Sequence, residues 1–400
     1  MSVPPRRFPT AAPDGLMAAL LLSFLATAGI FYINIMPALV SGLVDGLHFS
    51  ARDAGLVGSA NVYGAAVGAL VITFFVGHIA WRPTSVAMLC ALIAIDVVSL
   101  AIASPWALIA ARAVHGCVGG MLVGLAYSVF TRTRSPDRVF GVLLLLQFSV
   151  GSLGVYTLPR LVPLYGTSVL FVTLAGFSLV TLCMLPFLAP YPIRAASGGG
   201  PAARDTATAG DPAAAPARRR GLFMLALAAL FLFQASNMGL FSYIFELGKE
   251  AGLDRGFTSS AVATSTIVGA SGSLLVIVFA TRFGRAVPLA VALIVTLAGI
   301  WALHYSQYRA LFLLANCATG ITWSLVIPYL LGLCSAFDST GRAAALGGFA
   351  SKLGLATGPL IGALVQSGGR YGLLINLSCV GIVLCAAAAL PSARATDRPR

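Results

Sequence analysis

Charged side chains are scarce throughout this sequence. Only 9% of its 400 residues are Asp, Glu, Lys or Arg, whereas an ordinary soluble domain has about 25%. Lysine is rarest of all, with just Lys249 and Lys352, and the formal net charge is +13. Because the depletion runs along the whole chain and 58% of the residues are hydrophobic, the composition is typical of an integral membrane protein.

Several chemical signatures are also missing. The sequence has no G-x-x-x-x-G-K-[ST] phosphate loop and no H-E-x-x-H pair, which argues against ATP hydrolysis by that route and against a zinc hydrolase. The seven cysteines lie in apolar runs without C-x-x-C spacing, so we expect neither a disulfide framework nor a metal site. The sequence therefore predicts a protein that is not an enzyme and needs no cofactor.

Long apolar runs dominate what is present. A membrane-spanning helix needs about 20 apolar residues, and the sequence contains twelve such segments. They are residues 16–43, 55–77, 84–103, 106–131, 139–160, 167–189, 221–245, 259–280, 286–303, 309–335, 342–366 and 371–391. The first follows Arg6 and Arg7 as in a signal peptide, but it is too long for a signal core and is predicted to be a span.

The basic residues predict the orientation of these spans. With the N-terminus placed in the cytoplasm, most of the 25 Lys and Arg residues fall on the cytoplasmic side, as the positive-inside rule requires. Both termini are then cytoplasmic, and the membrane is predicted to be the bacterial inner membrane. This distribution explains the net charge without a nucleic-acid partner, so the expected surroundings are the lipid bilayer.

The chain is predicted to consist of two related halves. Residues 191–220 are rich in Ala, Gly and Pro and read as a flexible cytoplasmic linker between six-helix halves at 16–190 and 221–391. Residues 1–15 and 392–400 are the cytoplasmic tails. A constant offset of 204 residues places Gly68 on Gly272, Gly116 on Gly320 and Gly154 on Gly358. The predicted fold class is an all-α membrane protein with 12 transmembrane helices in two pseudo-symmetric halves.

Short motifs near the predicted loops resemble those of the major facilitator superfamily. After its second span the family has G-x-x-x-D-R-x-G-R-R, and this sequence keeps Gly77 and Arg82 but lacks the acid. The matching loop of the second half keeps R-x-G-R at Arg282, Gly284 and Arg285. In the family this loop latches the cytoplasmic gate by charge pairing, so the resemblance implies gating loops here.

The fourth span adds to the resemblance, because Arg112 and Gly116 match the family's R-x-x-x-G. The resemblance covers the whole chain and implies a secondary active transporter that works by alternating access. It further implies a small-molecule substrate, with protons or a counter-substrate supplying the energy, and a monomer.

Ionisable residues inside spans are the leading site candidates, because a charge at a helix centre costs about 2.5–3.5 kcal/mol on insertion scales. They are Asp96, Arg112, His115 and Lys352. Asp96 and Arg112 lie at similar depth on consecutive helices. One interpretation is a structural ion pair; the other is an Arg112 that binds an anion or couples to a proton. His115 is either a titrating group or a hydrogen-bonded packing residue.

Lys352 lies about 15 Å along its helix from Arg342, which is half of the apolar core. It is expected to meet a water-filled cavity, a carbonyl or a bound anion. Some anion exchangers of the superfamily, those for oxalate and formate, use a lysine on this helix, and the arrangement here is similar. Other candidate polar groups on the cavity helices are Asn34, Asn61, Tyr63, Gln147, Gln234, Asn237, Asn316 and Trp323.

The two cations, Arg112 and Lys352, favour a small organic anion as substrate, carried with protons or by exchange. Two alternatives remain open at this stage. One is an efflux carrier for drugs, other amphiphiles or sugars, and the other is a non-transporting membrane sensor or scaffold.

Overall fold

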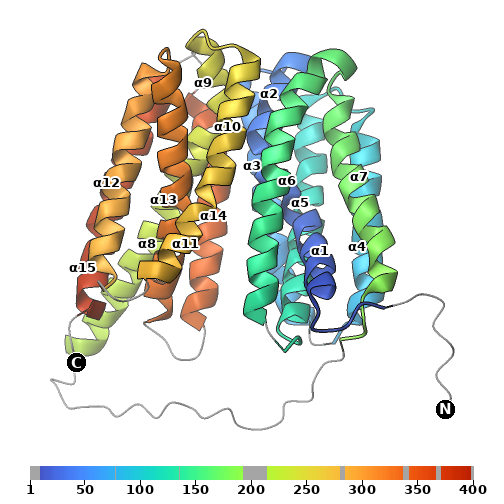
Figure 1. Cartoon of the computed structure of the whole chain (residues 1–400), viewed down its shortest axis with the longest axis horizontal. Helices are drawn as coiled ribbons and strands as arrows, with labels where there is room; N and C mark the ends of the chain where they lie inside the picture. Colours follow the sequence, from blue (N-terminus) through green and yellow to red (C-terminus); the bar gives the residue numbers. More distant parts are fainter. Residues whose placement is uncertain are drawn as a thin grey trace.

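The computed structural model describes residues 10–76, 78–134, 136–191, 214–279, 284–336, 342–365 and 371–397. These ranges are almost wholly helical (Figure 1). The first group of helices comprises α1 (Leu16–Asn34), α2 (Met36–Leu47), α3 (Ala51–Phe75), α4 (Trp81–Ser99), α5 (Pro105–Phe130), α6 (Pro136–Tyr165), α7 (Ser168–Met184) and the short η1 (Leu185–Phe187). The second comprises α8 (Ala214–Ser242), α9 (Ile244–Glu250), α10 (Arg255–Gly269), α11 (Ser271–Phe279), α12 (Ala286–Ala302), η2 (Leu303–Tyr305), α13 (Arg309–Ser335), α14 (Arg342–Val365) and α15 (Tyr371–Asp397).

These helices match the predicted spans. In the described part of the chain, eleven helices are long and apolar enough to cross a membrane. The predicted eighth span, 259–280, is divided into α10 and α11, which only Ala270 separates. The two pieces complete the set of twelve, so the predicted all-α membrane fold is confirmed.

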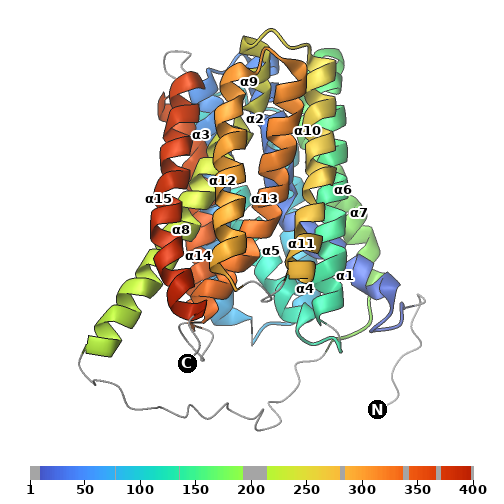
Figure 2. The ribbon, with the colours of Figure 1, turned by 60° about the vertical axis from the view of Figure 1, so that its left-hand side comes forward.

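The helices stand side by side in two groups, α1–α7 and α8–α15 (Figures 1 and 2). Helix α3 packs against α14, and α6 packs against α10, along the boundary between the groups. Large apolar side chains such as Phe74, Leu145 and Ile294 remain exposed on the outer surface. Such an apolar outer surface suits lipid, since polar backbone groups are satisfied within each helix.

Glycines allow helices within each group to approach closely, and two of these glycines occupy equivalent positions in the internal repeat. A Cβ on Gly68 would lie 1.9 Å from the carbonyl oxygen of Cys117, and one on Gly272 would lie 2.0 Å from that of Ile321. The two contacted residues, like the two glycines, are 204 residues apart in the sequence. The predicted internal repeat therefore describes real packing contacts and not a coincidence of glycine-rich composition.

The predicted first and seventh spans are each interrupted by one residue. Ile35, between α1 and α2, has φ −110° and ψ 16°, and Tyr243, between α8 and α9, has φ −111° and ψ 15°. Met36 and Pro37 open the second piece of the first span, where proline is tolerated because a helix's first N–H groups are unpaired. The same bend in both groups brings α2 and α9 together at one end of the molecule (Figure 1).

Polar contacts join the groups at mid-height and at this end. Arg160 on α6 donates to the carbonyl oxygen of Gly256 at 3.0 Å, and Ser152 donates to that of Ala263 at 2.9 Å. Tyr243 donates to the carbonyl oxygen of Ala51 at 3.2 Å. Helix α1 begins and α15 ends at the opposite end of the molecule (Figure 1). These polar contacts between the groups therefore lie far from Leu16 and Asp397.

Candidate functional site

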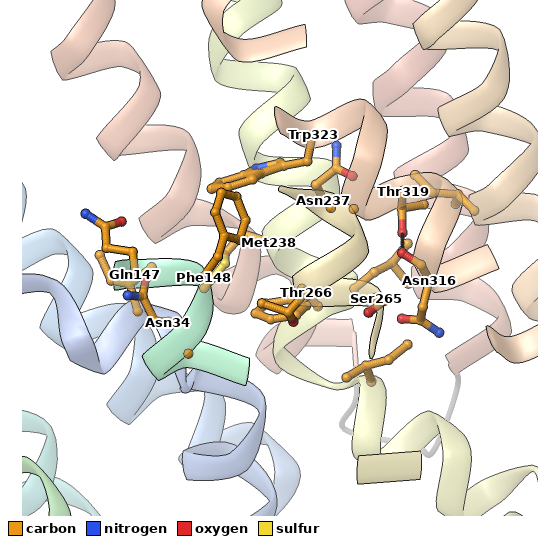
Figure 3. A pocket seen from close by; sticks show the side chains of 18 of the residues that line it. Asn34, Gln147, Phe148, Asn237, Met238, Ser265, Thr266, Asn316, Thr319 and Trp323 are labelled. Carbon is orange, nitrogen blue, oxygen red and sulfur yellow. Dashed lines mark hydrogen bonds between the residues drawn. The ribbon is translucent and has the colours of Figure 1, made fainter. Parts of the chain in front are cut away.

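A cavity of about 170 Å³ lies between the two groups of helices. Its walls come from α1 and α6 on one side and from α8, α9, α10, α12, η2 and α13 on the other (Figure 3). The polar lining consists of carboxamides, hydroxyls and one indole: Asn34, Gln147, Asn237, Asn316, Ser265, Thr266, Thr319 and Trp323. None of the described residues that line this cavity has an ionisable side chain. The site can therefore offer hydrogen bonds and aromatic surface, but no charge of its own.

Five of the residues chosen from sequence line this cavity: Asn34, Gln147, Asn237, Asn316 and Trp323. The other seven substrate or coupling candidates do not line it: Asn61, Tyr63, Asp96, Arg112, His115, Gln234 and Lys352. Asn316 is of interest because it occupies the repeat position of Arg112, 204 residues later. One helix of the repeat thus presents a carboxamide to the cavity where its counterpart carries a buried cation.

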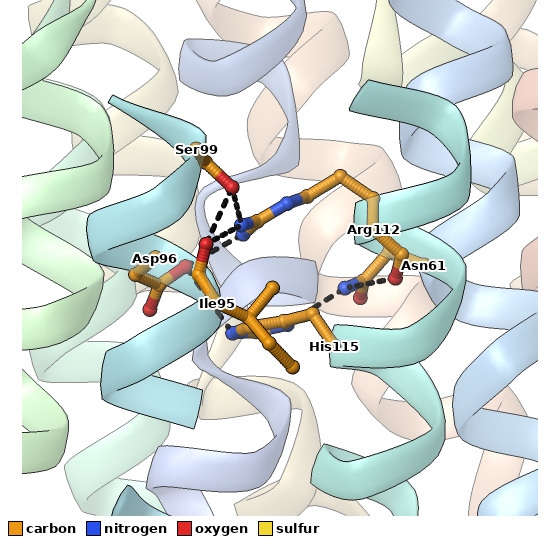
Figure 4. Close-up of polar contacts among 6 residues, drawn as sticks. All are labelled: Asn61, Ile95, Asp96, Ser99, Arg112 and His115. Atoms are coloured by element: carbon orange, nitrogen blue, oxygen red, sulfur yellow. Dashed lines mark hydrogen bonds and ion pairs between the residues drawn. The ribbon is translucent and has the colours of Figure 1, made fainter. Parts of the chain in front are cut away.

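Arg112 is paired inside the first group of helices. Its Nη1 lies 2.6 Å from Oδ1 of Asp96, and both side chains are 0% exposed (Figure 4). Nη2 of Arg112 also donates to the carbonyl oxygen of Ile95 at 3.3 Å and to the hydroxyl of Ser99. The guanidinium stands 5.1 Å from the ring centre of Phe171. The ion pair, one of the two interpretations of the sequence, is therefore present, and Arg112 has no excess charge to offer a ligand.

His115 belongs to the same network. The side-chain nitrogen of Asn61 donates to the carbonyl oxygen of Arg112 at 3.2 Å, which fixes the orientation of this amide. The same nitrogen lies 2.9 Å from Nδ1 of His115, so Nδ1 is the acceptor and Nε2 carries the ring proton. Nε2 is 3.4 Å from Oδ1 of Asp96. The proton on this imidazole thus points toward a buried carboxylate (Figure 4).

Lys352 lies beside a separate chain of hydrogen bonds. The indole N–H of Trp323 donates to Oε1 of Gln234 at 2.9 Å, and Nε2 of Gln234 donates to the hydroxyl of Ser351 at 2.7 Å. Lys352, the next residue on α14, is half-buried. Among the residues that the structure describes, no carboxylate lies within 4.0 Å of its ammonium group. Within the described ranges Lys352 is therefore an uncompensated cation, and it lies outside the lining of the cavity.

Tyr63 links the two groups of helices at mid-height instead of facing the cavity. Its hydroxyl oxygen lies 2.8 Å from that of Thr357 on α14. The rings of Phe148 and Trp323 also meet edge to face across the groups, with centres 6.5 Å apart. Both contacts must break or rearrange if the groups rock against each other.

The two predicted gating loops are only partly described, because Gly77 and Arg282 lie outside the described residues. Arg82 donates to the carbonyl oxygen of Leu188. In the second loop Gly284 has φ +67°, in the left-handed region that favours glycine. The backbone N–H groups of Arg285 and Ala286 donate to the carboxylate of Asp397 at 2.8 Å.

Asp397 is thus a contact that the sequence motif did not reveal. It comes from the end of α15 and places a carboxylate at the N-terminus of α12, where the helix dipole favours negative charge. This loop lacks the acid of the family motif, and a residue more than 100 positions away in the sequence supplies a carboxylate instead. No local signal in the sequence could have identified it.

The cavity also contains polar residues that sequence reasoning missed, among them Ser265, Thr266 and Thr319. Two signals could have identified them. Thr319 follows Asn316 by three positions and so shares its helix face, and Ser265 occupies the repeat position of Asn61. In the described part of the chain, no cluster of three His, Cys, Asp or Glu side chains could hold a metal ion.

A helical bundle in two repeated groups, with a cavity lined by apolar, aromatic and uncharged polar side chains between them in an apolar shell, defines a membrane transporter. The family model of the Major Facilitator Superfamily matches residues 19–359, and the chain belongs to this family. It is a membrane transporter and not an enzyme.

Solved structures of the same fold agree with this assignment. The nucleoside transporter NupG superposes with a TM-score of 0.71 at 13% sequence identity, over 96% of this chain and 100% of that chain. A bacterial homologue of the human lysosomal transporter Spinster, inward-facing and unoccupied, gives 0.71 at 14% identity, over 98% and 99%. No curated relative matches this chain by sequence. At these identities the likeness concerns the fold.

Proposed function

We propose that this chain is a secondary active transporter that moves a polar solute without net charge, carrying a flat ring, through the cavity between α1–α7 and α8–α15. The observation that carries the proposal is the lining itself, which combines four carboxamides with Phe148, Phe241 and Trp323 and, among the described residues, holds no ionisable side chain. Carboxamides satisfy uncharged polar groups, and aromatic rings provide stacking area. A nucleoside is a solute of this kind, and one structural neighbour is named as a nucleoside transporter.

The position of the cavity supports alternating access. Substrate sites of such carriers lie at the interface between the repeats, near the middle of the membrane. With the N-terminus placed in the bacterial cytoplasm, as the basic residues favour, the end fastened by α2 and α9 is the outer one. In this proposal, the structure then corresponds to a state in which the cavity is closed to the outside of the cell.

An ion gradient or substrate exchange is the proposed source of energy, since the sequence has no phosphate loop. His115 and Asp96 form the proposed proton-responsive pair, because a buried imidazole beside a carboxylate is sensitive to protonation. The proposed unit is a monomer, because the cavity is built from one chain.

A small organic anion remains the second candidate substrate, and Lys352 is the observation that favours it. A half-buried ammonium without a carboxylate partner in the described residues is suited to an anionic ligand. For this candidate the anion would have to approach α14 beside the cavity, since Lys352 is not part of the lining.

Transport into proteoliposomes distinguishes the candidates. The purified protein is reconstituted and tested for counterflow of radiolabelled adenosine and of a small dicarboxylate. We expect adenosine to exchange and Lys352→Met to leave this exchange intact. We expect Trp323→Ala to reduce it by about 5- to 150-fold, since loss of a well-placed contact costs about 1–3 kcal/mol.

The opposite pattern, in which the dicarboxylate exchanges and Lys352→Met abolishes its flux, would replace the first candidate by the second. Selective export of amphiphilic drugs would favour an efflux carrier. The absence of flux for every class of solute would favour a sensor or scaffold.

A further inference from the structure

The carboxamides on the α8–α15 side of the cavity have a defined orientation. Nδ2 of Asn237 donates to the carbonyl oxygen of Phe233 at 2.9 Å, and Nδ2 of Asn316 donates to that of Phe312 at 2.7 Å. A backbone carbonyl can only accept a hydrogen bond, so the atom facing it must be the amide nitrogen in both cases. One N–H of each carboxamide is therefore engaged with its own helix, and each side chain keeps Oδ1 as an acceptor and one further N–H.

The hydroxyl groups on this side are engaged in the same way. Ser265 and Thr266 each donate to the carbonyl oxygen of Val262 at 2.8 Å, and Thr319 donates to that of Ala315 at 3.0 Å. A hydroxyl has one proton and two lone pairs. Once the proton is used within the helix, only the lone pairs remain for a ligand.

The indole of Trp323 follows the same pattern, because its N–H already donates to Oε1 of Gln234 at 2.9 Å. In the described part of this wall, the hydroxyls and the indole have no donor left. The five polar side chains of α8, α10 and α13 therefore offer oxygen lone pairs, against one remaining N–H on each of the two carboxamides. We call the wall formed by Asn237, Ser265, Thr266, Asn316 and Thr319 the acceptor wall (Figure 3).

The opposite wall, from α1 and α6, differs. Nδ2 of Asn34 is buried and has no hydrogen-bond partner among the residues that the structure describes. Gln147, also in the lining, makes no hydrogen bond among the described residues, so its amide can turn toward a ligand. Both N–H groups of Asn34 are therefore available to a ligand on this side.

We infer that the transported solute presents N–H or O–H donors to the acceptor wall and an acceptor, such as a carbonyl or ring nitrogen, to Asn34. The inference rests on the proposed function and deepens it by naming the substrate's hydrogen-bonding pattern. A vicinal diol or an exocyclic amine meets the acceptor wall with complementary protons. A carboxylate placed there faces five acceptor side chains and at most two free N–H groups, so it and the wall lose most of the hydrogen bonds that water supplied.

Matched compounds test this pattern in the purified wild-type protein. Ligand binding is measured by thermal shift and by displacement of radiolabelled adenosine. One pair is adenosine and 2′,3′-dideoxyadenosine, which lacks two hydroxyl donors. The other is nicotinamide and nicotinate, which differ by a carboxamide against a carboxylate. We expect at least tenfold weaker binding of the dideoxy compound, and displacement by nicotinamide but not by nicotinate.

Variants locate the effect on the wall. Asn237→Leu and Asn316→Leu remove an acceptor with little change in size, and each should reduce the preference for adenosine over its dideoxy analogue to about threefold or less. Asn376→Leu on α15 is the matched control, since this carboxamide contacts His304 outside the cavity, and it should retain the preference.

The inference is overturned if the dideoxy compound binds as well as adenosine, if nicotinate displaces as well as nicotinamide, or if both leucine variants keep the wild-type preference. It is also overturned if no donor-bearing compound of this panel binds. A different result would contradict the proposed function, namely that the wild-type protein binds these compounds but transports none of them in proteoliposomes.

Discussion

The ammonium group of Lys249 on α9 donates a hydrogen bond to Oδ1 of Asp45 on α2 at 3.0 Å. This ion pair joins the two groups of helices at the end where α2 and α9 meet (Figure 1). Arg255 on α10 donates to the other oxygen of the same carboxylate. Asp45 is thus the shared partner of two cations from the opposite group, and its carboxylate fastens the closed end of the molecule.

We predict that Asp45→Asn weakens this closure. The Lys249 side chain is 62% exposed, so its pair contributes less than about 1 kcal/mol. Losing both pairs should therefore shift the ratio of closed to open molecules by about fivefold or somewhat more. Spin labels at Arg52→Cys and Glu250→Cys, in a background without the native cysteines, report the opening as a longer distance by pulsed electron spin resonance.

A matched control exists within one group of helices. Asp254→Asn removes the pair between Arg309 and Asp254 while keeping a good cap for α10, and it should leave the distance distribution unchanged. An unchanged distribution in Asp45→Asn would show that the carboxylate does not hold the groups together.

The same pair predicts the behaviour at high pH. Hydrogen bonding to Asp45 raises the pKa of Lys249 above its ordinary value of 10.5. The stabilising contribution is therefore fully present below pH about 10 and is lost as the pH rises through the raised pKa. The short spin-label distance should persist from pH 7 to about 10 and lose population above that range. Loss of the short distance near neutral pH would contradict this.

Asp96 and Arg112 allow a test that separates a structural role from a functional one. Asp96→Asn leaves a buried guanidinium without its counter-charge, which costs about 3–5 kcal/mol, so the thermal unfolding temperature in detergent should fall sharply. Replacing both residues, with Asp96→Leu and Arg112→Met, should restore most of the lost stability, since no charge remains buried.

Transport by the stable double variant then decides the role of the pair. Normal flux with normal pH dependence would make the pair structural. A stable protein without proton-driven flux would make it part of the coupling machinery. A double variant less stable than Asp96→Asn would contradict the argument from buried charge.

Close helix contacts predict a graded series of glycine variants. A Cβ on Gly116 would lie 1.8 Å from the carbonyl oxygen of Asn61, and one on its repeat counterpart Gly320 would lie 2.8 Å from that of Ser265. Gly176 has no atom within 4 Å of its added Cβ. We expect the loss of unfolding temperature on substitution by Ala to follow the order Gly116, Gly320, Gly176.

For Gly116→Ala, the loss of unfolding free energy should reach or exceed the usual cost of overpacking, about 1–3 kcal/mol, because the backbone must move. Gly176→Ala should be neutral or slightly stabilising, since Ala forms helices better than Gly by about 1 kcal/mol. Equal effects in all three variants would show that the contacts do not limit stability.

Most of the architecture could be predicted because its causes are local. Each span is a run of apolar residues long enough to cross the bilayer, and this property can be read from a window of about 20 residues. The internal repeat could be recognised because glycines such as Gly68 and Gly272 recur at one constant offset, and the backbone groups that they contact recur at the same offset. The division at Ala270 was not predicted, because the apolar pattern continues across it.

The sequence by itself determined that this chain is an all-α membrane protein of repeated helices, since hydropathy and spacing depend only on residues near one another. Only the tertiary structure decided which polar side chains meet the cavity. Arg112 and Asn316 occupy the same repeat position, yet the first is buried against Asp96 and the second lines the cavity. The physical reason is that side chains project all around a helix, and the packing of neighbouring helices sets which of them face inward.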